Sequence, residues 1–141
     1  MPPGEAQVFT VGILMKVFRI LLWSQSLYTL LTAMWPLLDI ESFMMVTGYK
    51  RDVWLVKTVG ALLIPVALTL LSHLFIDTDH RPALILGSLT AVAFISIDFY
   101  YALNDVIWDV YLLDGAVEIV FLIGWIYLFF TSYEMLKGSR K

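Results

Sequence analysis

The segment VYLLDGAVEIVFLIGWIYLFFTSY, residues Val110 to Tyr133, decides the class of this protein. A bilayer core of about 30 Å is crossed by about 20 predominantly apolar helical residues, and this segment is long and apolar enough to cross it. It nevertheless carries two carboxylates, Asp114 and Glu118, one helical turn apart. Placing a charge at the centre of a bilayer costs ~3 kcal/mol on insertion scales. These two side chains are therefore expected to face the interior of a helix bundle.

Three further segments are long and apolar enough to span a membrane, at about residues 17–38, 53–75 and 82–103. Together with the span at about 110–133 they form one transmembrane domain over residues 1–141. Hydrophobic residues make up 60% of the chain, more than a soluble globular domain carries. The segment upstream of the first span, Val8 to Arg19, either continues that helix or lies along the membrane surface.

The connection between the first two spans, DIESFMMVTGYKRD, is too polar to cross the membrane. Its apolar residues recur at helical spacing, which predicts a short interfacial helix with Asp39 as N-cap and Gly48 just past its end. Asp52 is the expected N-cap of the second span. The later connections are tight, so consecutive spans are expected to be antiparallel neighbours. The predicted fold is all-α, an integral membrane up-down four-helix bundle.

The distribution of Lys and Arg predicts the orientation of the bundle. Most of these residues lie in the terminal segments and the second loop: Lys16, Arg19, Arg81, Lys137, Arg140 and Lys141. The first and third loops hold only Lys50 and Arg51. Both termini are therefore expected in the cytoplasm, in a multi-pass protein of the cell inner membrane.

Composition narrows the chemistry that the chain can perform. It has no cysteine, which excludes disulfides, Cys-ligated zinc and iron–sulfur clusters. A net charge of −3 with nine Lys and Arg residues argues against nucleic-acid binding. His73 and His80 are predicted at the interface away from the acidic residues, so no metal site is expected. No phosphate-binding or dinucleotide motif is present, and the sequence names no cofactor.

Ionisable residues of three spans are predicted at one level of the membrane. With a rise of 1.5 Å per residue, Lys57 and Asp98 lie roughly 7 Å inside the outer ends of their spans, and Asp114 and Glu118 lie roughly 6 and 12 Å deep. Lys57 is the base expected at that level, with Asp98 as its partner. One base facing three carboxyls leaves an excess of negative charge. Either a carboxyl keeps its proton, with Glu118 as the candidate, or a cationic ligand occupies the site.

Aromatic and hydroxyl side chains are predicted to form the walls around these charges. They are Tyr28, Thr32, Trp54, Tyr101 and Tyr111. The sequence thus predicts a pocket in the outer half of the bundle, with a charged mouth, aromatic walls and an apolar floor. It is expected to open towards the outside or sideways to lipid.

The leading interpretation is a membrane protein that binds a small amphipathic or lipophilic ligand in this pocket. Glu118 and Asp114 would engage its polar end, and Lys57 and Asp98 would set the charge, with proton transfer or transport left open. One alternative is an accessory or structural subunit of a larger membrane complex, in which the polar cluster only joins helices. Another is a small membrane-embedded enzyme with Glu118 as general acid or base. The expected partners are membrane lipid, a lipophilic small molecule, and partner subunits or further copies of the chain.

The segments KRDVWLVKTVG and IDFYYALNDVIWDVYLLDGAVE, together with the four-span layout, resemble a group of uncharacterised small bacterial four-helix membrane proteins. The resemblance covers about the last three spans. It implies the four-helix fold and brings no activity, so it assigns no functional residue.

Overall fold

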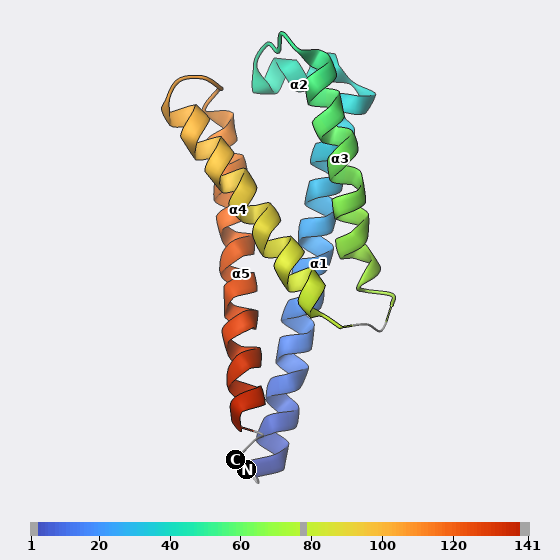
Figure 1. The fold of residues 1–141 in the computed structure, drawn as a ribbon, viewed down its shortest axis with the longest axis vertical. Helices are drawn as coiled ribbons and strands as arrows, with labels where there is room; N and C mark the ends of the chain where they lie inside the picture. Colours follow the sequence, from blue (N-terminus) through green and yellow to red (C-terminus); the bar gives the residue numbers. More distant parts are fainter. Residues whose placement is uncertain (1–2, 77–78, 139–141) are drawn as a thin grey trace.

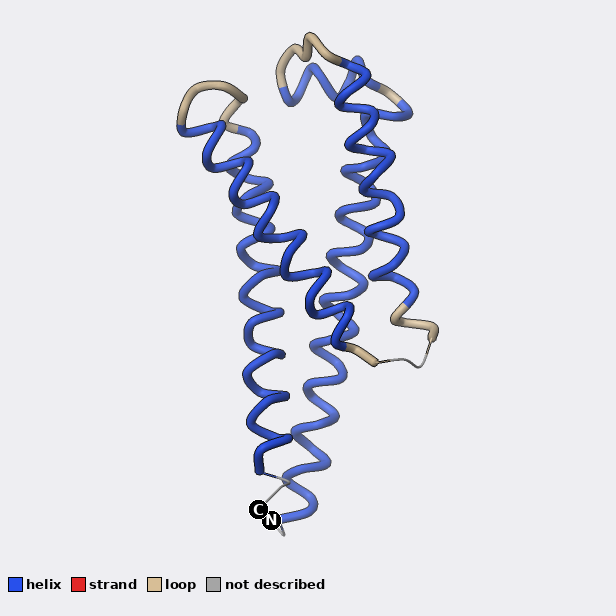
Figure 2. Tube along the Cα trace, in the orientation of Figure 1, coloured by secondary structure: helices blue, strands red, loops and turns tan. Residues whose placement is uncertain are grey.

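The computed structural model describes residues 3–76 and 79–138, and these residues form five helices and their connections (Figure 1). The helices are α1 (Pro3–Leu38), α2 (Ile40–Thr47), α3 (Val53–Ser72), α4 (Arg81–Leu103) and α5 (Val110–Gly138). All except α2 are long and apolar enough to cross a membrane. No strand occurs in the described part of the chain (Figure 2). The predicted all-α class, with four helices long and apolar enough to span a membrane and a short helix after the first, is confirmed.

Three helix boundaries differ from the predicted spans: the start of the first, the end of the second, and the end of the fourth, where α5 continues to Gly138. The first helix starts at Pro3, so the segment upstream of the first predicted span continues the helix. The third helix ends at Ser72, short of the predicted end at about residue 75. The backbone N–H of His73 donates to Leu70 O at 3.3 Å and that of Leu74 donates to Leu71 O at 3.1 Å. These i to i−3 bonds tighten the last turn and end the α-helix.

The short helix α2 is capped at both ends by the predicted residues. The Asp39 side chain accepts a hydrogen bond from the Ser42 backbone N–H at 3.1 Å, and this bond lowers the pKa of Asp39. Gly48 ends the helix with φ +86°, and a Cβ at this position would lie 2.7 Å from the Trp108 indole nitrogen. Glycine is therefore required both by the backbone and by the contact. Asp52 occupies the N-cap position of α3, but its side chain makes no capping hydrogen bond.

The four long helices associate as two pairs. The first pair is α1 with α3, and the second is α4 with α5. Figure 1 shows α1 and α5 close together at the end where α1 begins and α5 ends, and the two pairs diverging towards the end that carries α2. Contacts between α3 and α4 are few. The bundle is therefore open in the half that contains α2.

A buried apolar core closes the other half. It is formed mainly by α1, α5 and the start of α4 and contains Leu14, Phe18, Leu21, Leu22, Ala83, Phe121, Trp125 and Leu128. Within it the Trp125 and Leu22 side chains are fully buried. This core holds the two pairs together at one end and leaves them separate at the other.

The two pairs are joined in the middle of the bundle by contacts among Gln25, Gly87 and Trp125. The Trp125 Nε1–H donates to Gln25 Oε1 at 2.6 Å, and Gln25 Nε2 donates to Gly87 O at 3.1 Å. Gln25 and Trp125 are fully buried, and the Trp125 ring lies directly against Gly87. We call Gln25, Gly87 and Trp125 the polar clasp. Because they come from α1, α4 and α5, they fix the point from which the pairs diverge.

Candidate ligand-binding site

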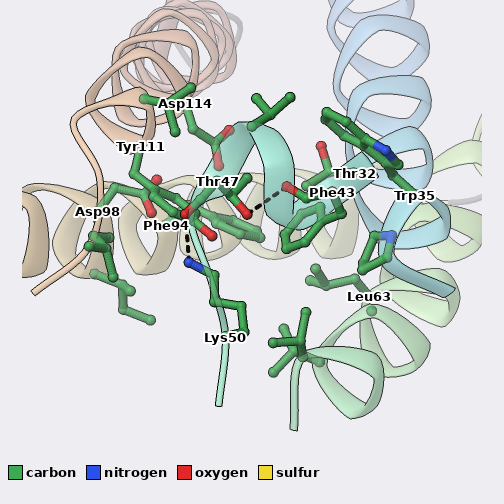
Figure 3. Close-up of a pocket in the computed structure, with 18 of the residues that line it drawn as sticks. Thr32, Trp35, Phe43, Thr47, Lys50, Leu63, Phe94, Asp98, Tyr111 and Asp114 are labelled. Atoms are coloured by element: carbon green, nitrogen blue, oxygen red, sulfur yellow. Dashed lines mark hydrogen bonds between the residues drawn. The ribbon is translucent and has the colours of Figure 1, made fainter. Parts of the chain in front are cut away.

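A cavity of about 620 Å³ lies between the two helix pairs in the half of the bundle that contains α2 (Figure 3). All five helices contribute to its lining. Apolar side chains make up most of its wall: Trp35, Pro36, Phe43, Val46, Leu55, Val56, Val59, Leu63, Phe94, Ile97, Ile107, Val110, Leu113 and Val117. Both the volume and the apolar lining are typical of small-molecule sites.

Side chains on α3 and α4 that line the cavity are also exposed at the surface of the bundle. Leu55 on α3 and Ile97 on α4 both line it, yet their side chains are 49% and 54% exposed. The few contacts between these two helices leave this surface uncovered.

Most of the predicted site residues meet at this cavity. Those that line it are Tyr28, Thr32, Asp98, Tyr101, Tyr111 and Asp114. Their spacing along α1, α4 and α5 turns them towards the gap between the pairs. Figure 3 shows Asp98, Tyr111 and Asp114 on one wall, and Thr32 and Leu63 on the other side of the space.

Asp98 is the most deeply buried carboxylate that lines the cavity. Its side chain is 3% exposed, and its Oδ2 atom has no hydrogen-bond partner among the described residues. Gly115 explains how it comes to lie beside α5, because a Cβ on Gly115 would lie 3.4 Å from Asp98 Cβ and 2.7 Å from the Phe99 ring. The absence of a side chain at Gly115 lets α4 and α5 approach closely at the level of Asp98.

Asp114 is tied to α1 across the cavity. The Tyr28 hydroxyl donates a hydrogen bond to Asp114 Oδ1. Tyr28 also packs against Phe121, with ring centroids 5.8 Å apart in an edge-on arrangement. This hydrogen bond occupies one carboxylate oxygen of Asp114 and joins the two helix pairs at the inner end of the cavity.

Glu118 lies one turn deeper than Asp114 and does not line the cavity. Its side chain is 1% exposed, and its Oε2 atom has no partner in the described segments. Glu118 is one helical turn from Asp114 on α5, and Asp98 lies beside Gly115, between them on the same helix. The predicted gathering of three carboxyls is therefore present, with Glu118 beneath the cavity.

Two predicted site residues lie outside the cavity. Lys57 is half-buried on α3 and is not part of the lining, and no ion pair joins it to Asp98 within residues 3–76 and 79–138. Trp54 is 69% exposed and does not reach the cavity. The reason is the rotation of α3: it packs against α1 through Gly60, where a Cβ would lie 2.6 Å from Ala33 O. The expected Lys57–Asp98 pair is not formed.

Lys50 is a site residue that the sequence indicates only as a charge in the loop after the interfacial helix. It lines the cavity from the connection after α2. Its Nζ donates to Thr47 O at 2.7 Å and lies 4.9 Å from the centroid of the Tyr111 ring (Figure 3). Burial lowers the pKa of Lys50. The turn at Gly48 brings this ammonium back over the cavity, and that turn was the only signal in the sequence for it.

No family model, curated protein or solved structure matches the chain. The resemblance to small bacterial four-helix membrane proteins stays a prediction. The function is therefore inferred from the shape, lining and charges of the cavity.

Proposed function

We propose that this protein binds a lipophilic or amphipathic small molecule in the cavity between its two helix pairs. One observation carries the proposal: a cavity of about 620 Å³ with a mostly apolar wall contains the buried carboxylate of Asp98, which has an oxygen without a partner in the described chain. Small-molecule sites combine a large apolar surface with a few polar groups that orient the ligand. Buried polar atoms are normally hydrogen-bonded, so Asp98 Oδ2 marks where a ligand group would bind.

The lining supports one orientation of such a ligand. Its polar end would lie against Asp98 and Asp114, and its apolar body would lie against Val59, Leu63 and Phe94. Entry between α3 and α4 places the apolar body next to the lipid. Glu118, buried below the cavity, would then serve as a proton store close to Asp114 and not as a direct contact of the ligand.

We also propose that the protein lies in the cell inner membrane with both termini in the cytoplasm. The first helix begins and α5 ends at the same end of the bundle, and α2 lies at the opposite end (Figure 1). Lys and Arg are concentrated near the former end, which favours the cytoplasmic side for it. The cavity would accordingly lie in the extracytoplasmic half of the membrane.

The Lys57–Asp98 pair is not formed, so it gives no support to the alternative in which the polar cluster only joins helices. Membership of a larger complex and an enzymatic role for Glu118 stay predictions, since no contact in the described residues favours either.

Filling the cavity tests the proposed function. Leu63 lines the cavity, and its neighbour Leu62 is 65% exposed and does not. Leu63→Trp places an indole in the space that a ligand would occupy, whereas Leu62→Trp places it in lipid. In native mass spectrometry of gently extracted protein, wild type and Leu62→Trp should retain a co-purified lipophilic molecule, and Leu63→Trp should retain at least about tenfold less, a loss of about 1.4 kcal/mol. Equal adducts on all three proteins, or none on wild type, would contradict the proposal.

A further inference from the structure

We infer that the ligand carries a protonated amine, and that its N–H groups bind between Asp98 and Asp114. This inference rests on the proposed function and names the chemical class of the ligand. The apolar part of this ligand is a hydrocarbon chain or ring system. Two kinds of molecule combine such a part with a protonated amine: a membrane lipid with an amine headgroup and a free lipophilic amine.

The charges around the cavity point to a cation. Asp98 and Asp114 both line it, and Glu118 lies just beneath. The cationic side chain in the described lining is Lys50, and its ammonium is bonded to Thr47 O and lies over Tyr111. Neither carboxylate has an ion-pair partner among the residues described. A carboxylate taken out of water without a counter-charge is costly, so a ligand that brings a positive charge gains the most from this site.

The hydrogen bonds point to a cation that carries N–H groups. Asp98 Oδ2 is buried and has no donor within the described residues. Asp114 Oδ1 already accepts the Tyr28 hydroxyl, and its carboxylate keeps further lone pairs. A primary ammonium has three donors and can serve both carboxylates, whereas a quaternary ammonium has none. Hydrogen bonds between two charged groups are about twice as strong as neutral ones.

The aromatic wall already holds one ammonium. Lys50 Nζ lies 4.9 Å from the Tyr111 ring centroid, within the range of a cation–π contact. Tyr111 lines the same cavity as Asp98. The wall beside the carboxylates is thus suited to a positive charge, and Lys50 would repel a second cation that enters. Removing its charge is therefore expected to strengthen the binding of an amine.

Matched probes test the class of the ligand. The full chain is placed in nanodiscs of phosphatidylcholine and phosphatidylglycerol, and binding of dodecylamine, dodecyltrimethylammonium and dodecanol is measured by calorimetry against empty nanodiscs. Dodecylamine should bind at least about tenfold more tightly than the other two, because only it supplies charge-assisted donors. Asp98→Asn should weaken dodecylamine binding about tenfold and remove this preference. Lys50→Met should strengthen it about threefold.

The controls separate the possible failures. Asp105→Asn changes a carboxylate in the loop outside the cavity, at a residue with φ +56° that asparagine tolerates, and should leave binding unchanged.

Melting curves are recorded for every variant. Asp114→Asn provides a second test if Asp98→Asn does not fold. Dodecanol binding as tightly as dodecylamine would overturn the amine inference and leave the proposed function intact. No probe bound above the level of empty nanodiscs would overturn both.

A further lipid composition distinguishes the two sources. Phosphatidylethanolamine in the nanodiscs should compete with dodecylamine if the natural ligand is an amine-headgroup lipid. Unchanged dodecylamine binding in those nanodiscs would support a free lipophilic amine instead. Both results support the amine class, because both require a tight and Asp98-dependent dodecylamine site.

Discussion

Gly87→Leu is expected to destabilise the protein by about 3 kcal/mol or more, the upper range for overpacking a buried site. A Cβ at Gly87 would lie 2.5 Å from Trp125 Cε2, closer than real Cβ atoms approach. The indole has no space to retreat, since it is fully buried and its Nε1–H is bonded to Gln25. The added side chain would therefore push α4 away from α5 at the point where the helix pairs meet. Unfolding titrations in mixed micelles measure the effect.

Gly12→Leu is the matched control for this prediction. Gly12 lies in α1 with no atom within 4 Å of a Cβ added there, so the substitution should leave the free energy of unfolding within about 0.5 kcal/mol of wild type. A Gly87→Leu protein as stable as Gly12→Leu would show that Trp125 does not pack against α4.

Gln25→Leu is expected to cost about 1–2 kcal/mol. The substitution keeps roughly the same volume and removes the hydrogen bonds to Trp125 Nε1 at 2.6 Å and to Gly87 O at 3.1 Å. It leaves the indole N–H buried without an acceptor, which costs about 1–3 kcal/mol in soluble proteins. Interhelical hydrogen bonds within membranes are worth less, about 0.6 kcal/mol on average and up to about 1.7. The same unfolding titrations measure the loss.

A double-mutant cycle separates the hydrogen bond from packing. In the background of Trp125→Phe, which has no N–H, Gln25→Leu should cost at least about 0.5 kcal/mol less than in wild type. Ser24→Ala serves as the control, because Ser24 Oγ donates to Ile20 O of its own helix at 2.6 Å. Purely additive effects of the two changes would contradict the role given to the polar clasp.

The fold class could be predicted from the sequence because it depends on quantities that the sequence contains directly. Length and hydrophobicity locate the membrane spans, and local capping chemistry locates α2 between Asp39 and Gly48. The depth of Asp98 and Asp114 follows from the rise along a helix, so their meeting at one level could also be predicted. These inferences require no knowledge of which helix touches which.

The partner of each charge could not be predicted in the same way. The depth of Lys57 follows from its position along the helix, but the direction of its side chain depends on how α3 rotates when Gly60 packs against α1. That rotation is decided by tertiary contacts, and they turn Val56 and Leu63 towards the cavity and leave Lys57 outside the lining. The sequence does not indicate Lys50 as a site residue, because it reaches the cavity only through the backward turn at Gly48. The separation of the helix pairs likewise depends on the Gln25 to Trp125 contact between distant segments.

The space between the helix pairs is proposed to receive a lipophilic molecule. The most direct test is a crystal structure of the protein with a bromine-terminated long-chain alcohol, a probe that does not depend on the amine inference. Anomalous scattering should place the bromine inside the cavity, near Leu63 and Phe94 between α3 and α4. Bromine found only on the outer surfaces of the helices, with the cavity collapsed or filled by side chains, would contradict it.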